Sequence, residues 1–129
     1  MKRDWIHPLF LIAAVYDFGL GVIVLAMYPA IYTYFGIAPP NHSAYVELPA
    51  ALVTIFGVGF WMVSRDPWRN RDIIKLGILL KLAYAGIVLG HAARGAMPGL
   101  WIPWAWADLA FAAAFVLALR TLGRNAEKV

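Results

Sequence analysis

The chain has 129 residues, of which 63% are hydrophobic and 14% are charged, and it contains no cysteine. Its mean hydropathy is +0.71, whereas soluble domains are about half apolar and about a quarter charged. A chain of this length has too small an interior to bury so many apolar residues away from water. We therefore expect an integral membrane protein. Without cysteine, disulfides and thiolate metal sites are excluded. The net charge of +4 does not indicate nucleic-acid binding, because the basic residues flank apolar runs instead of sharing one face.

The first apolar run covers approximately residues 8–28 and follows Lys2 and Arg3. A basic start before an apolar run is typical of a signal peptide. This run is about twenty residues long, contains Asp17 and lacks a small-x-small cleavage site. We therefore expect a retained first membrane helix. The proline-rich stretch 29–45 that follows is expected to break any helix and form a loop.

Three further apolar runs reach membrane length, which is roughly 17–25 residues for a helix. They cover approximately 47–64, 73–92 and 101–119. Within the run 73–92, Gly86 and Gly90 have the GxxxG spacing that favours a close helix contact. The four runs and their short connectors predict an all-α membrane four-helix bundle, threaded up-down-up-down, as one domain over residues 1–129.

Basic residues distinguish the two ends of the predicted bundle. The second connector contains Arg65, Arg69 and Arg71, whereas the first contains no Lys or Arg and the third only Arg94. By the positive-inside rule, both termini should lie in the cytoplasm and the first and third connectors outside. The basic residues of the C-terminal tail add to this bias; they are Arg120, Arg124 and Lys128.

Three of the four runs carry one ionisable residue near their middle. At ~1.5 Å per residue, Lys81 lies roughly 13 Å inside its run, close to the centre of a hydrocarbon core about 30 Å thick. Asp17 reaches nearly the same depth, and Asp108 lies about one turn further out. A lone charge at a helix centre costs about 2.5–3.5 kcal/mol. We therefore predict that the three side chains meet, with Lys81 as the counter-ion between two carboxylates.

Helical periodicity places four further aromatic or polar side chains toward the outer half of the runs, and three of them share a face with these charges. We predict a cavity that opens outward, with the three charges as its floor and the other four residues lining its entrance. The predicted ligand-binding residues are Asp17, Lys81, Asp108, Tyr84, His91, Trp104 and Glu47.

The sequence does not identify a cofactor, and it predicts no metal site. His42, Glu47, His91 and Asp108 are expected on the outer half, but no H-x-x-x-H or E-x-x-H spacing joins them. Phosphate-binding loops and catalytic motifs such as GxSxG or HExxH do not occur. Whether the protein is an enzyme therefore stays open at this point.

The charge balance of the predicted cluster has two interpretations. Two acids and one base leave an uncompensated negative charge, so the cluster is expected to bind a proton, a cation or a cationic ligand. Alternatively, the ion pairs only fix helix orientation or dock a partner subunit.

The segment 45–84, YVELPAALVTIFGVGFWMVSRDPWRNRDIIKLGILLKLAY, resembles small bacterial four-helix inner-membrane proteins, including the DoxX-like group. The resemblance rests on layout, namely four spans and a short Arg-rich second connector. It implies a bacterial inner membrane and raises an association with quinone or redox partners; no family motif carries over residue by residue. Asp17 in a short four-span chain is also similar to small multidrug resistance exporters, but Lys81 and the unbalanced charges depart from them.

Three functions follow from these observations. The first is a non-catalytic module that binds an apolar ligand with a polar head, of the quinone or lipid class, or that serves as an accessory subunit of a larger membrane complex. The second is a proton-coupled small-molecule transporter in which Asp17 or Asp108 exchanges a proton for substrate. The third is an intramembrane enzyme that uses the same acids, with His91 as general acid or base. Besides the lipid bilayer, the expected partners are a hydrophobic small molecule, a membrane protein or further copies of the chain.

Overall fold

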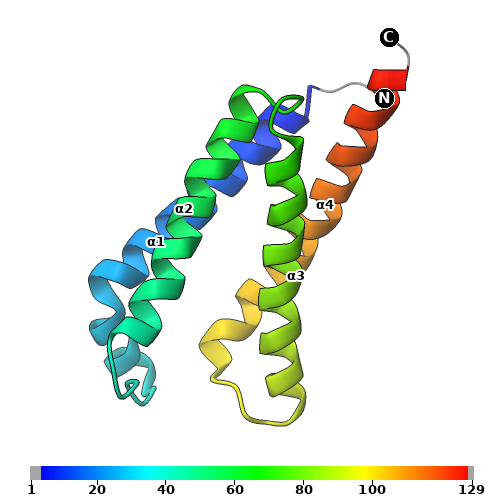
Figure 1. Cartoon of the computed structure of the whole chain (residues 1–129). Coiled ribbons are helices and arrows are strands. Elements are labelled where there is room, and N and C mark those ends of the chain that lie inside the picture. The colour runs from blue at the N-terminus through cyan, green and yellow to red at the C-terminus, as the bar shows by residue number, and fades with distance from the viewer. Residues whose placement is uncertain (1–3, 128–129) are drawn as a thin grey trace.

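The structure, a computed structural model, describes residues 4–127, and the side chains up to residue 124. Over this range it is all-helical (Figure 1). The elements in chain order are α1 (Ile6–Phe35), α2 (Ala44–Arg65), α3 (Arg71–Ala93), the short 3-10 helix η1 (Gly99–Trp101) and α4 (Ile102–Glu127). By length and composition, each of the four long helices is able to cross a membrane. The prediction of an all-α protein with four helices long and apolar enough to span a membrane is confirmed.

The first helix is two turns longer than the predicted span 8–28. Pro29 lies inside α1, and the helix ends at Gly36, which has a φ of 66°. The N–H groups of Gly36 and Ile37 bond back to carbonyls of the last turn, as in a Schellman motif. The prediction that 29–45 is a loop throughout was therefore wrong. One proline removes only one backbone hydrogen bond, and membrane helices tolerate this loss.

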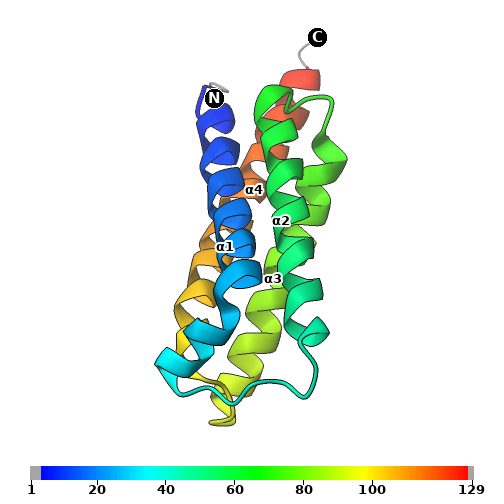
Figure 2. The same cartoon turned by 90° about the vertical axis from the view of Figure 1, so that its left-hand side faces the viewer.

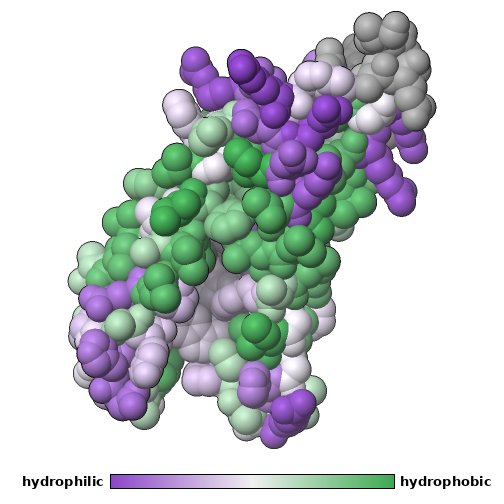
Figure 3. All heavy atoms as spheres, viewed as in Figure 1, coloured by the Kyte–Doolittle hydropathy of each residue, from purple (hydrophilic) through white to green (hydrophobic). Residues whose placement is uncertain are grey.

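The two ends of the molecule differ in what they contain. In Figures 1 and 2, the start of α1, the α2–α3 connection (66–70) and the end of α4 lie together, at what we call the terminal end. The connections 36–43 and 94–101 lie at the opposite end, the loop end. Hydrophilic residues gather at both ends and a hydrophobic belt lies between them (Figure 3). Lys128, which the topology prediction uses, and Lys2 and Arg3, which were considered as the start of a signal peptide, lie outside the described residues.

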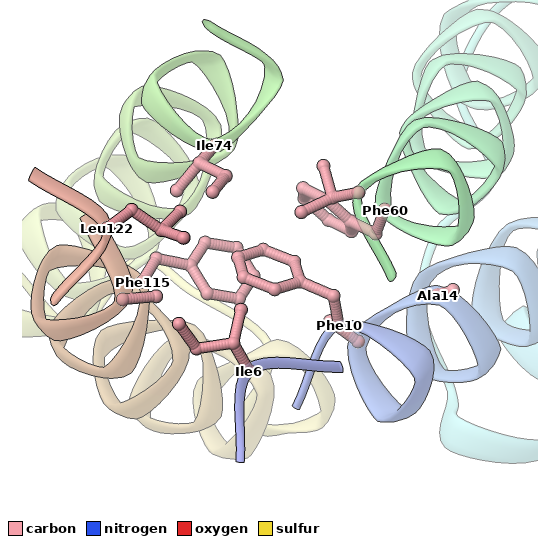
Figure 4. Close-up of a cluster of buried hydrophobic side chains, with 10 residues drawn as sticks. Ile6, Phe10, Ala14, Phe60, Ile74, Phe115 and Leu122 are labelled. Carbon is pink, nitrogen blue, oxygen red and sulfur yellow. The ribbon is translucent and has the colours of Figure 1, made fainter. Parts of the chain in front are cut away.

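At the terminal end, side chains from all four helices form one apolar core. The Phe10 ring of α1 stacks on Phe115 of α4 with centroids 4.5 Å apart, and Phe60 of α2 meets Phe115 edge-on at 5.1 Å. Ile74 of α3 and Leu122 of α4 close the cluster (Figure 4). Aromatic pairs at these distances stabilise the core beyond simple burial, so the four helices are held together here.

Two glycines bring α1 and α2 into close contact along their length. A Cβ on Gly57 would lie 2.5 Å from the backbone nitrogen of Phe18, and a Cβ on Gly21 would lie 2.7 Å from the carbonyl oxygen of Ala50. Such distances are too short for any side chain larger than glycine. Small residues at these positions let the two backbones pack directly, which is a common way to join helices in lipid.

The predicted close contact through Gly86 and Gly90 is not formed within the chain. Both glycines are exposed on α3, and no atom of the described residues lies within 4 Å of a Cβ built on either. The contact between α3 and α4 near the loop end instead uses Ala85, Val88 and Ala105. The GxxxG spacing was a misleading guide because its two residues face away from α4.

Toward the loop end the molecule separates into two helix pairs, α1 with α2 and α3 with α4. The pairs diverge in Figure 1, and the space-filling view shows a hollow between them (Figure 3). Among the described residues, the buried side chains of the apolar core near the loop end come from α3 and α4, whereas those of the terminal core come from all four helices. Tyr32 of α1 reaches the smaller core through Trp101 of η1, with ring centroids 6.1 Å apart. The fold therefore leaves space between the pairs on the loop-end side of the molecule.

Candidate functional site

The three predicted midplane charges meet in one buried cluster. The Lys81 ammonium donates hydrogen bonds to Asp17 Oδ1 at 2.6 Å and to Asp108 Oδ1 at 3.1 Å. The exposed fractions of the three side chains are 1% for Lys81, 2% for Asp17 and 10% for Asp108. The prediction that Lys81 is the counter-ion of two carboxylates is confirmed, and we call these three residues the Asp-Lys-Asp cluster.

The cluster connects the two helix pairs. Asp17 belongs to α1 and Lys81 to α3, so their bond links one pair to the other, whereas the bond from Lys81 to Asp108 of α4 lies within a pair. One turn before and after Lys81, the small residues Gly77 and Ala85 are also buried. At Gly77 the missing side chain leaves room for the Phe60 ring, because a Cβ there would lie 2.5 Å from Phe60 Cε1.

Three aromatic rings enclose the ammonium group together with the carboxylates. The Lys81 Nζ atom lies 5.0 Å from the ring centroid of Tyr16, 5.1 Å from that of Phe111 and 5.6 Å from that of Phe60. At these distances the ring faces attract the cation. None of these three aromatic residues is among the predicted ligand-binding residues. Tyr16 is next to Asp17 in the sequence, but Phe60 carries no signal that separates it from ordinary core.

Two polar atoms in this buried region have no hydrogen-bond partner among the described residues. They are Asp17 Oδ2 and the Tyr16 hydroxyl. Because an unpaired polar atom in an apolar interior is costly, these atoms are ready partners for a water molecule, a proton or a polar group of a ligand. If all three charged groups are ionised, the cluster carries one excess negative charge. This charge further favours binding of a proton or of a positively charged group.

An open pocket of about 940 Å³ lies at the loop end, between the end of α1 and the start of α4. It is lined mainly by apolar residues of the two connections; its members are Phe35, Gly36, Ile37, Ala38, Pro98, Gly99, Leu100, Pro103 and Trp104. We call it the loop-end pocket. The ring centroids of Trp104 and Tyr16 lie 6.0 Å apart, and the Tyr16 ring in turn contacts the ammonium of Lys81. The pocket and the cluster are therefore connected through two adjoining aromatic rings.

The remaining predicted entrance residues differ in their positions. Tyr84 is half-buried on α3, and its hydroxyl donates to the carbonyl of Trp101 at 3.1 Å, which ties α3 to η1. Glu47 and His91 are exposed at the loop-end turns of α2 and α3. In the part of the chain that the structure describes, neither has a side-chain hydrogen bond to the cluster. Their role in lining the entrance stays a prediction.

Comparisons with protein-family models, with curated proteins and with solved structures find no match. Within residues 4–127, no group of three or more His, Asp or Glu side chains is placed to hold a metal ion. The resemblance of segment 45–84 to the DoxX-like group thus stays a prediction from layout. Functional inference rests on the Asp-Lys-Asp cluster, its aromatic surroundings and the adjoining pocket.

Proposed function

We propose that this chain is a non-catalytic protein of the bacterial inner membrane that binds an apolar molecule with a polar head, of the quinone or lipid class. The ligand enters from the loop end and lies between the two helix pairs, with its head toward the Asp-Lys-Asp cluster. The observation that carries the proposal is the unpaired hydrogen-bonding capacity beside a buried charged cluster, at the point where the helix pairs part and close to an apolar pocket.

The chemistry of the cluster suits a head group that both donates and accepts hydrogen bonds. The Tyr16 hydroxyl is free to donate, and Asp108 is the most exposed carboxylate of the cluster. A quinone carbonyl would accept from the tyrosine, and a hydroxyl or amine of the head would donate to the aspartate. The excess negative charge of the cluster favours a head group that can donate a proton to it. Trp104 and the apolar walls of the loop-end pocket would contact the tail.

The proposal includes an orientation in the membrane. Arg65, Arg69 and Arg71 at the terminal end outnumber Arg94 at the loop end. The positive-inside rule then places both termini in the cytoplasm, threads the helices up-down-up-down and opens the pocket toward the periplasmic leaflet.

Native mass spectrometry of the protein gently extracted from its host membrane tests the proposal. We expect a constant additional mass of small-molecule size on the wild type and its loss, at least tenfold, on Asp108→Asn. Asp4→Asn is the matched control, because it neutralises an exposed carboxylate near the start of α1, away from the cluster. Retention of the same mass by Asp108→Asn would refute the role of the cluster. Additional polypeptides in place of a small mass would support the alternative of an accessory subunit.

A proton-coupled transporter is the second candidate, and one observation favours it. Among the described residues, the bond from Lys81 to Asp17 is the ion pair that links the two helix pairs, and it would break if Asp17 took up a proton. Protonation would then allow the pairs to move against each other. This alternative differs from passive binding because it requires proton release upon substrate addition, and that release should disappear in Asp17→Asn.

A further inference from the structure

A groove at the terminal end is independent of the Asp-Lys-Asp cluster and has the opposite charge. It has a volume of about 470 Å³ and lies where α3 begins beside the last turns of α4. Three of its lining residues are basic; the complete lining is Arg69, Arg71, Asp72, Lys75, Leu119 and Gly123. We call it the basic groove. Its single carboxylate, Asp72, is bonded to Lys75 at 2.9 Å, so the groove keeps a net positive charge.

The basic side chains are held in place by the surrounding connection. The guanidinium of Arg71 lies 4.2 Å from the ring centroid of Trp68, a cation–π contact that limits its freedom. The backbone N–H of Arg69 donates to Asp66 Oδ1 at 3.1 Å, and the Asn70 amide bonds to two backbone carbonyls. The connection is therefore an ordered loop, which fixes the backbone at Arg69 and holds the Arg71 guanidinium beside Trp68 before any ligand arrives.

The groove also has the apolar side that a lipid requires. Leu119 forms part of its wall, Gly123 adds no side-chain bulk, and Leu76, next to Lys75 in the sequence, is exposed on α3 with 54% of its surface accessible. Basic residues that flank a membrane-spanning segment, with apolar residues one turn deeper, match the depths of a lipid phosphate and its acyl chain.

We infer that the basic groove binds the phosphate head group of an anionic phospholipid, with the acyl chain lying along α3 and α4. The lipid source is favoured over free phosphate because the groove lies at the end of two membrane-spanning helices and has an apolar wall. The inference is independent of the proposed ligand, since the groove and the cluster share no residue.

A titration of the full-length protein in mild detergent tests the inference, with bound lipids resolved by native mass spectrometry. The probes are phosphatidylglycerol and phosphatidylcholine with the same acyl chains. We expect phosphatidylglycerol to bind at least fivefold more tightly. Arg71→Gln should weaken phosphatidylglycerol binding about fivefold, the effect of one basic residue near a lipid surface, and leave phosphatidylcholine unchanged.

Arg65→Gln is a closely matched control. Arg65 is also an arginine at the terminal end that lies over an indole ring, that of Trp61 at 5.8 Å, but it does not line the groove. An equal loss of affinity in both variants would overturn the inference in favour of a general charge effect. Equal binding of the two lipids, or displacement of phosphatidylglycerol by inorganic phosphate at equal concentration, would also overturn it. Thermal unfolding of each variant shows that it is folded.

Discussion

Lys81 carries its ammonium group into the middle of an apolar helix, where both of its hydrogen-bonded partners are carboxylates. Both carboxylates depend on Lys81 for their counter-charge, because all three side chains are almost completely buried. Removal of Lys81 leaves two buried carboxylates without a counter-charge in a medium of low dielectric constant, which costs more than the intact cluster contributes. Replacement of all three by neutral groups of similar shape avoids that cost.

At this scale we predict that Lys81→Met destabilises the protein by about 3–5 kcal/mol. The triple variant Asp17→Asn, Lys81→Met, Asp108→Asn should be more stable than the single variant, because no uncompensated charge remains. Lys75→Met is the control, since Lys75 is 62% exposed in its ion pair, and its unfolding midpoint should equal that of the wild type. The measurement is unfolding in mixed micelles with increasing denaturing detergent. A triple variant as unstable as Lys81→Met would show that charge is not the cause.

At the level of helices, α1 and α2 pack through glycine whereas α3 and α4 pack through alanine and valine. The difference follows from the sequence, since Gly21 and Gly57 lie on the facing sides of the first pair and no larger residue would fit there. Lipid tails are as apolar as the helix surfaces, so close packing, and not hydrophobic burial, holds such a pair together. The first pair is therefore sensitive to single methyl groups.

We expect Gly57→Ala to destabilise the protein by about 1–3 kcal/mol, as overpacking does in a tight interface. The added methyl group would meet the backbone of Phe18, which cannot rotate away as a side chain can. Gly86→Ala serves as the control, because nothing lies within 4 Å of its added carbon. Unfolding of the two variants in the same detergent mixture gives the comparison. Equal stability of both would contradict the direct backbone packing of α1 on α2.

The whole molecule combines a closed terminal end with a divided loop end. Four helices converge on the aromatic core of Phe10, Phe60 and Phe115, and the Asp-Lys-Asp cluster links the helix pairs closer to the loop end. Beyond the cluster the pairs part and the loop-end pocket opens. This asymmetry is what a binding site accessible from one side of a membrane requires. Its biological meaning depends on which end faces the cytoplasm.

Single cysteines introduced into this cysteine-free chain test the proposed orientation. Asn41→Cys and Ala96→Cys are exposed positions at the loop end, and Asp4→Cys is an exposed position near the start of α1. In intact spheroplasts, a membrane-impermeant maleimide should label the first two and not the third. Asp4→Cys should be labelled only after the membrane is permeabilised. The reverse pattern would invert the topology and place the pocket on the cytoplasmic side.

Composition and apolar run length were sufficient to predict four membrane-spanning helices, because the thickness of the bilayer sets the length of such a run. The depth of Asp17, Lys81 and Asp108 also followed from the sequence, because a helix advances by a constant rise per residue. Their contact could be predicted because isolated charges are too costly in lipid to remain apart.

Other features depended on the tertiary structure. Nothing in the helical periodicity shows that Tyr16 and Phe60 lie against Lys81, that Glu47 and His91 face outward, or that α1 continues through Pro29. In a bilayer an apolar side chain is equally stable whether it faces lipid or another helix. Hydrophobicity therefore does not reveal which face of a helix contacts its neighbour. Side-chain shape determines the contacting face: glycines allow two helices to approach closely, and aromatic rings fill the space between helices.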